Sequence, residues 1–316
     1  MKKIHLLCML LAVPALLTAQ TNVEVKYEGK PLGKTNSVKV TFIEKMPREY
    51  DAPFQGMDIY KNYMLSLQHF GMANVYKING KKIKKKGQFK LGSFNDRKTP
   101  KDFNHANVAS FSRQFLNKGD KLPLLYVTRC NGVTYCKGMQ QVLFVEHVDP
   151  VNMKSEWIQT IGYDDSFLST RHTTQWCVDT ENNMLYGLGN SKENPNRHFI
   201  IKFKMPEYRG PQDSIVLLKE SDVLERYFIE DYYKRPDWQP LIQGMYIRNN
   251  LLYLPWGLGR STNPSVIYVW DLKNRCMQNA INVQNEIPHE LEDGSFYGKK
   301  ILIVQASSGH VYKIDL

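Results

Sequence analysis

A pentapeptide reading QGMDI at residues 55–59 returns almost unchanged as QGMYI at residues 243–247. Each copy opens a run of short apolar segments that ends in a tyrosine-containing strand, at 75–78 in the first run and 266–270 in the second. Alternation and β-branched or aromatic content predict that these segments are strands. The two runs therefore indicate an internal repeat.

The same order of segments occurs five times, and the leading polar residues stand at positions 55, 105, 175, 243 and 289. Self-similarity at such a period is typical of solenoids, propellers or arrays. A unit of three or four short strands is the blade of a β-propeller. We therefore predict an all-β fold, a five-bladed β-propeller. The alternative is a β-sandwich whose strands resemble one another by chance.

The ends of the chain indicate how the ring closes. The last repeat reaches Leu316 with only three clear strands, whereas two strand-like runs, 23–27 and 38–43, precede the first repeat. We expect this N-terminal segment to complete the last blade, because ring closure protects sheet edges from pairing with other chains.

One insertion interrupts the repeats. Residues 221–228 begin with a capping serine, carry acids in the first turn and space apolar residues as a helix does. We predict a short helical insertion near residues 220–235, which could also bind a protein partner.

The N-terminus resembles a secretory signal. Lys2 and Lys3 precede an apolar stretch at 4–17, and Ala19 precedes an expected cleavage site before Gln20. We expect a signal peptide over residues 1–19 and a single propeller domain over 20–316. The mature chain would then be an exported monomer, periplasmic, on the cell surface or secreted, with no transmembrane span.

Charge and cysteine content add little about partners. The formal net charge is +11, and residues 81–86 contain five lysines, which we interpret as a solvated turn. The excess charge could attract anionic partners, or it could simply maintain solubility; we expect no nucleic-acid partner. Oxidising export would permit disulfides among four cysteines, whose pairing the sequence leaves open: Cys130, Cys136, Cys177 and Cys276.

The leading residues of the inner strands are the main candidates for ligand binding. In a propeller these residues converge at one mouth of the central channel, where they would supply hydrogen-bond donors and acceptors. The candidates are Gln55, His105, Gln175, Gln243 and His289, with Asn107 on the same strand face as His105. Gly56 and Gly244 would allow close backbone approach. Alternatively, these polar groups only bond one another and lock the blades together.

Two further sets of residues could carry recognition or catalysis. Asp58 and Glu290 belong to the first and last blades, so they are the least arbitrary pair of carboxylates for an enzyme. Trp256 could stack on a sugar face, and Arg260 in the following loop could pair with an anionic substituent. The sequence lacks nucleotide-binding and serine-hydrolase motifs, and we expect neither a metal nor a cofactor.

Two families share short motifs with this chain. The sequence FQGM at 54–57 resembles the opening segment of five-bladed glutaminyl-peptide cyclotransferases, and HELE at 289–292 is similar to their NELE segment. This resemblance implies that Glu290 would be the proton-transfer group of a cyclising enzyme. Phe54 and His289 stand where that family has Thr and Asn. The QG and HAN segments that open the repeats also resemble helveticin-type secreted propellers, which implies the fold and little chemistry.

We therefore expect an exported propeller that binds a small polar molecule or a glycan at one mouth of its channel. The first alternative is a propeller enzyme, either cyclotransferase-like or glycan-cleaving, that uses Glu290. The second is a scaffold for protein interaction.

Overall fold

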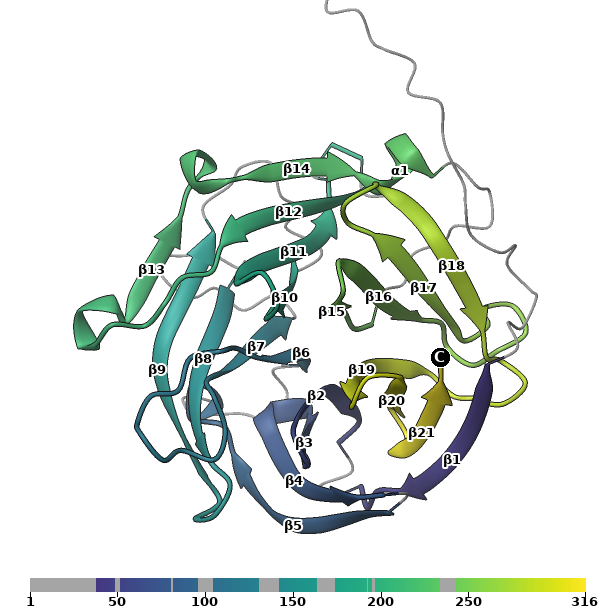
Figure 1. The fold of residues 1–316 in the computed structure, drawn as a ribbon, viewed down its shortest axis with the longest axis horizontal. Coiled ribbons are helices and arrows are strands. Elements are labelled where there is room, and N and C mark those ends of the chain that lie inside the picture. Colours follow the sequence, from purple (N-terminus) through teal and green to yellow (C-terminus); the bar gives the residue numbers. More distant parts are fainter. Residues whose placement is uncertain are drawn as a thin grey trace, which may run out of the picture.

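The computed structural model describes residues 38–48, 52–80, 82–95, 105–130, 142–163, 174–191, 193–194, 197–233 and 243–316. Within these ranges the chain forms five sheets that surround a central axis as blades (Figure 1). The prediction of an all-β five-bladed propeller is confirmed. The expected signal peptide lies outside the described residues.

Each blade is built from four antiparallel strands, of which the first along the chain lies nearest the axis in blades one to four. Blade one contains β2 (Phe54–Tyr60), β3 (Tyr63–Gln68), β4 (Met72–Asn79) and β5 (Lys82–Lys90). Blade two contains β6 (His105–Phe111), β7 (Leu125–Cys130), β8 (Val142–Asp149) and β9 (Lys154–Tyr163). Blade three contains β10 (Gln175–Asp179), β11 (Met184–Asn190), β12 (His198–Lys204) and β14 (Glu225–Phe228). Blade four contains β15 (Tyr246–Arg248), β16 (Leu251–Trp256), β17 (Val266–Asp271) and β18 (Cys276–Asn282).

The fifth blade joins the two ends of the chain. It contains β19 (Leu291–Tyr297), β20 (Ile301–Ala306), β21 (His310–Asp315) and, outermost, β1 (Lys39–Lys45). Strand β1 runs antiparallel to β21, with Lys39 opposite Asp315 and Lys45 opposite His310. This arrangement confirms ring closure by an N-terminal strand; the other expected strand, at 23–27, lies outside the described residues.

The insertion differs in part from the prediction. Short helical turns occur at Glu220–Asp222 and in α1 (Ile229–Tyr232), but Glu225–Phe228 between them is strand β14. This segment pairs with β12 as the outer strand of blade three, so tertiary pairing overrides its helical spacing. A further strand, β13 (Ile215–Leu218), runs parallel to β9 and ties blade three to blade two.

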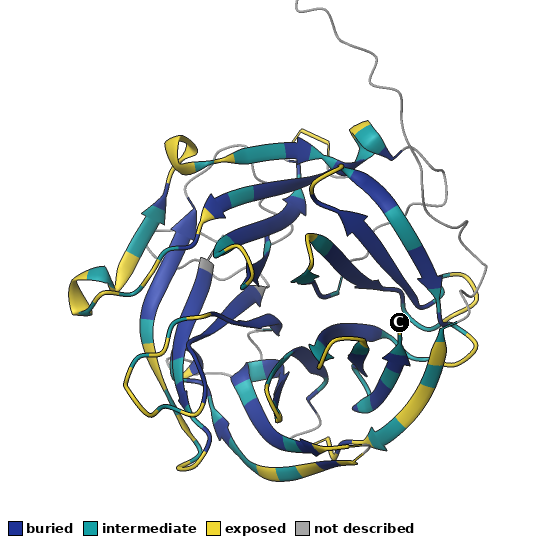
Figure 2. Cartoon of the chain, in the orientation of Figure 1, coloured by how far each residue is buried: buried dark blue, intermediate teal, exposed yellow. Residues whose placement is uncertain are grey.

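The lysine-rich segment is also a strand rather than a turn. In β5, Lys82, Lys84 and Lys86 are exposed whereas Ile83 and Phe89 are buried. Only one face of this outer strand contacts the blade, so the lysines remain in solvent and mark a charged sheet edge. Figure 2 shows the same contrast over the whole ring, with buried inner strands and exposed outer loops.

The apolar core is divided into wedges between blades rather than gathered in one centre. One cluster joins blades three, four and five, and contains the fully buried Trp270 and Tyr268. Other clusters lie between blades two and three and between blades one and two. Because both faces of the second strand of a blade pack against neighbours, sequences such as LLYLPW in β16 are continuously apolar.

Two glycines of the repeat permit the inner strands to approach closely. A Cβ on Gly56 would lie 2.7 Å from the carbonyl oxygen of Ala106, and one on Gly244 would lie 2.3 Å from that of Glu292. Neither space could hold a methyl group. The expectation of close backbone approach at these glycines is therefore confirmed.

A turn motif, Asp-x-x-Asn, recurs after three strands. Asp149, Asp179 and Asp271 each accept two backbone N–H groups through Oδ1 and a side-chain N–H of the asparagine three residues later through Oδ2. The side chain satisfies backbone donors that a strand no longer uses. These turns keep the strands of a blade short.

Candidate functional site

The inner strands end around a pocket of about 490 Å³. All five contribute to it: β2 through Asp58 and Tyr60, β6 through Ser110 and Phe111, β10 through Cys177, β15 through Arg248 and β19 through Ser295. The chain direction places this pocket at the C-terminal ends of the inner strands. The residues predicted from the repeat lie at the opposite, N-terminal ends.

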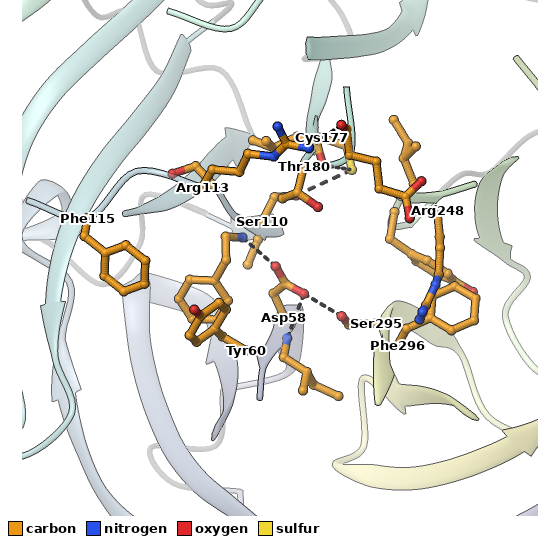
Figure 3. Close-up of a pocket in the computed structure, with 18 residues that line it drawn as sticks. Asp58, Tyr60, Ser110, Arg113, Phe115, Cys177, Thr180, Arg248, Ser295 and Phe296 are labelled. Carbon is orange, nitrogen blue, oxygen red and sulfur yellow. Dashed lines mark hydrogen bonds between the residues drawn. The ribbon is translucent and has the colours of Figure 1, made fainter. Parts of the chain in front are cut away.

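Asp58 is the central polar group of the pocket (Figure 3). Its Oδ2 accepts the backbone N–H of Phe111 at 2.5 Å, and its Oδ1 accepts the hydroxyl of Ser295 at 2.5 Å and the N–H of Ile59 at 2.7 Å. Burial raises the pKa of Asp58 to about 6, against the opposing effect of these three hydrogen bonds. The carboxyl group thus joins three blades and titrates near neutral pH.

Arginines and aromatic rings form the rim. Arg113 and Arg248 lie on different sides of the pocket, and each donates a hydrogen bond to a backbone carbonyl, those of Glu181 and Gly298 respectively. Tyr60 meets Phe111 and Phe115 edge to face, at ring-centroid distances of 6.1 and 5.9 Å. The rim therefore offers both positive charge and an aromatic wall.

Cys177 lies in the wall beside the hydroxyl of Ser110, which is 3.5 Å from its Sγ. The thiol is buried and not in a disulfide. Burial raises its pKa far above the ordinary thiol value, and the nearby acids Asp293, Asp58 and Asp179 add to the rise. The sulfur is thus kept as a neutral thiol, which is a poor nucleophile.

Two more carboxyl groups, Glu292 and Asp293, lie inside the channel below the pocket. Asp293 accepts the N–H groups of Met57 at 2.9 Å and Ala109 at 3.4 Å, where register shifts interrupt β2 and β6. Such irregularities leave backbone donors outside the ladder, and the carboxyl group satisfies them. Burial raises the pKa of Glu292 and of Asp293 well above the ordinary range.

The predicted polar ring is partly assembled: one hydrogen bond joins two of its members, and the others contact residues outside it. Asn107 donates to the backbone oxygen of Gln243 at 3.0 Å, and Gln243 donates to Glu290 at 2.7 Å. Gln55 is buried, and its side-chain N–H donates to the backbone oxygen of Phe54 at 2.8 Å. Gln175 is half-buried at the start of β10. The bond from Asn107 reaches across the axis from blade two to blade four, and the bond from Gln243 joins blade four to blade five.

The two predicted histidines stack on other histidines. The ring of His105 lies 3.8 Å from that of His69, and the ring of His289 lies 4.1 Å from that of His310. Burial lowers the pKa of His105 to about 4 and that of His69 to about 3, with the neighbouring His105 and Arg48 contributing to the second shift. The stacked pairs are therefore neutral at physiological pH.

The predicted carboxylate pair is separated by the length of the inner strands. Asp58 bonds to Ser295, and Glu290 lies five residues before that serine, directly ahead of the start of β19. At roughly 3.3 Å per residue the separation is about 16 Å, which exceeds the 5–9.5 Å of glycosidase carboxyl pairs. The geometry does not support Asp58 and Glu290 as one catalytic pair.

The predicted rim residues also have other surroundings. Trp256 is buried in the core and meets Tyr268 edge to face at 5.7 Å, so it is a packing residue rather than a stacking platform. Arg260 is exposed and forms an isolated bridge with Asn263. The loop that carries it crosses His289, because a Cβ on Gly259 would lie 2.4 Å from the nitrogen of that residue.

Two features bear on metals and membranes. Across the described ranges, no group of three or more His, Cys, Asp or Glu residues is arranged to hold a metal ion. No helix in the described part of the chain is long and apolar enough to cross a membrane. Cys177 and Cys276 are both buried thiols. Cys136 lies outside the described residues, so the structure does not test a disulfide between Cys130 and Cys136.

Comparisons with known proteins add no family. No protein-family model matches the chain, and no curated protein matches it in sequence. Among solved structures, the computationally designed protein Ika8 matches with 9% identity over 84% of this chain and 97% of that chain, at a TM-score of 0.36. The fold is identified as a propeller from the five sheets described above and not from this similarity.

Proposed function

We propose that this protein binds a small polar ligand in the pocket at the C-terminal ends of the inner strands. The observation that carries the proposal is the convergence of all five inner strands on one 490 Å³ cavity with Asp58 at its centre. That volume falls within the range of small-molecule sites, about 300–1,000 Å³. Few polar groups, held by several strands, would fix the ligand's orientation.

The opposite mouth is the weaker candidate for the same function. Asn107 donates to the backbone oxygen of Gln243 there, and Gln243 donates to Glu290, so both amides already make hydrogen bonds within the protein. The likeness to cyclotransferase motifs also centres on Glu290, which does not line the pocket. Binding at Asp58 is therefore proposed in place of catalysis at Glu290.

The test compares variants at the two mouths. Thr180→Trp would fill the pocket with an indole, whereas His105→Ala combined with His289→Ala would alter the opposite mouth and leave the pocket intact. Binding of a panel of sugars, amino acids and short peptides would be measured by calorimetry, with thermal unfolding as the check on folding.

We expect any ligand of the wild type to be lost in Thr180→Trp and retained in the double histidine variant. A ligand near 100 times its dissociation constant would add about 2.7 kcal/mol to the free energy of unfolding. The reverse result, loss in the histidine variant alone, would place the ligand at the mouth predicted from the repeat and reject the proposal.

A further inference from the structure

The charge of the pocket changes from its centre to its rim. Asp58 is the carboxyl group at the centre, and the guanidinium groups of Arg113 and Arg248 stand at the rim. The rim also carries the carboxylate of Glu181, which accepts the backbone N–H of Asn249. Among the described residues, neither arginine lies within ion-pair distance of a carboxylate. Each guanidinium group has five N–H donors and donates one hydrogen bond to a neutral backbone carbonyl. Several of its donors can therefore bind a ligand.

An aromatic wall adjoins this positive rim. Phe115 is 39% exposed, and it stands beside Tyr60 at the pocket edge. On the other side, the guanidinium of Arg248 lies over the ring of Phe296 at 4.6 Å. Aromatic rings offer a flat apolar surface to one face of a ring-shaped ligand, whose polar edge stays free for hydrogen bonds.

The centre of the pocket suits hydroxyl groups. Asp58 already accepts two hydrogen bonds at Oδ1 and one at Oδ2, which leaves Oδ2 with acceptor capacity. The hydroxyl of Ser110 lies beside it in the same wall. A ligand hydroxyl could donate to Asp58 and accept from such a neighbour, as sugar hydroxyl groups do.

Resting on the proposed binding pocket, we infer that its ligand is an acidic sugar, a pyranose that carries a carboxylate. The sugar ring packs on the wall of Tyr60 and Phe115, its hydroxyl groups bond to Asp58, and its carboxylate meets Arg113 or Arg248. Guanidinium and carboxylate form short, paired hydrogen bonds that a neutral sugar cannot supply. The net charge of +11 would also favour the approach of anionic glycans.

The experiment compares matched sugars on the full chain. Calorimetry would measure galacturonic acid and glucuronic acid beside galactose and glucose, which differ from them only at the carboxylate carbon. We expect each acid to bind at least tenfold more tightly than its neutral counterpart. Arg113→Gln combined with Arg248→Gln should remove this difference, so that each acid binds no more tightly than its neutral counterpart.

A second variant controls for total charge. Lys204→Gln with Arg209→Gln also removes two positive charges, but both residues are exposed on blade three and outside the pocket. It should bind the acids as the wild type does. Equal loss in both double variants would overturn the inference, since long-range attraction alone would then explain the preference.

The remaining outcomes separate this inference from the proposed function. Equal binding of acidic and neutral sugars, lost in Thr180→Trp, would reject the acidic ligand and keep the pocket. If no sugar binds while another molecule binds and is lost in Thr180→Trp, the acidic-sugar inference again fails alone. A ligand that binds equally to Thr180→Trp would overturn both.

Discussion

Asp58 is the single residue on which the behaviour of the pocket depends most. Its carboxyl group is held by donors from β6 and β19 as well as from its own strand, so its position is fixed before any ligand arrives. Burial raises its pKa to about 6, although the hydrogen bonds from these donors act in the opposite direction. Small changes of pH near neutrality therefore change its charge, and with it the acceptor that we assign to ligand hydroxyl groups.

This leads to a prediction for the pH dependence of binding. The ionised carboxylate is the better acceptor, so sugar affinity should rise as the pH increases through about 6 and become constant above about 7. Asp58→Asn should bind about 10–100-fold more weakly at pH 8, because a hydrogen bond to a charged group contributes about 1.5–3 kcal/mol. It should also lose the pH dependence. Calorimetry at pH 5, 6, 7 and 8 would check both points.

The pH dependence can be attributed to Asp58 because an ordinary sugar carboxylate stays ionised over most of the range from pH 5 to 8. Thermal unfolding of Asp58→Asn would be recorded at each pH to confirm that it is folded. An affinity that is constant from pH 5 to 8 in the wild type would show that Asp58 does not contact the ligand.

At the scale of elements, β1 is the strand that turns an open array into a ring. It covers β21, which would otherwise present unpaired backbone groups to solvent and to other chains. Ile43 of this strand also packs against the cluster between blades one and five. Its contribution to stability is therefore larger than its exposed outer face suggests.

We predict that a chain beginning at residue 46 melts roughly 10 °C or more below a chain beginning at residue 38. The two differ by β1, and losing its ladder and packing should cost several kcal/mol, at about 2–4 °C per kcal/mol for a chain of this size. The shorter chain should also associate through the open edge of β21, which size-exclusion chromatography would detect. Equal melting temperatures and a monomeric shorter chain would contradict this role.

How well the sequence predicts each element depends on which forces act on it. The inner strands are buried on both faces, so their apolar runs and the repeat of Gln55 at Gln243 identify them directly. Outer strands carry weaker signals. Strand β14 has helical spacing, and β5 consists largely of lysines, yet both pair with a neighbouring strand. The local periodicity of a segment does not indicate which distant strand it pairs with.

At the scale of the whole molecule, the repeated polar residues predict a site at one mouth of the channel, whereas the pocket lies at the other mouth. The repeated residues Gln55 and Gln243 both contact blade five, Gln55 through its backbone oxygen to Gln305 and Gln243 through its side chain to Glu290. The pocket residues Asp58, Cys177 and Arg248 stand three, two and five residues after the leading residues of their repeats and share no chemistry, so no repeat marks them. Of the predicted site residues, only Asp58 lines the pocket, and the sequence suggested Glu290 as its partner.

The axis of the propeller also sets how stability varies with pH. Burial raises the pKa of Glu292 well above its ordinary value, with Glu290 and Asp293 adding to the rise. The folded chain therefore keeps a proton on Glu292 at pH values where the unfolded chain, with an ordinary glutamate, has released it. Unfolding then releases a proton, so this residue makes the protein less stable as the pH rises above about 4.5.

Glu292→Gln should remove that penalty, because the amide has the shape of the protonated acid and cannot ionise. We expect the variant to melt several degrees above the wild type at pH 8 and the difference to vanish near pH 4, since each pKa unit corresponds to about 1.4 kcal/mol and each kcal/mol to roughly 2–4 °C. Scanning calorimetry at both pH values measures this. Glu156→Gln, at an exposed position of β9, should change neither value. A difference that is the same at pH 4 and pH 8 would mean that Glu292 is ionised in the folded ring, and that the channel holds a charge which its neighbours stabilise.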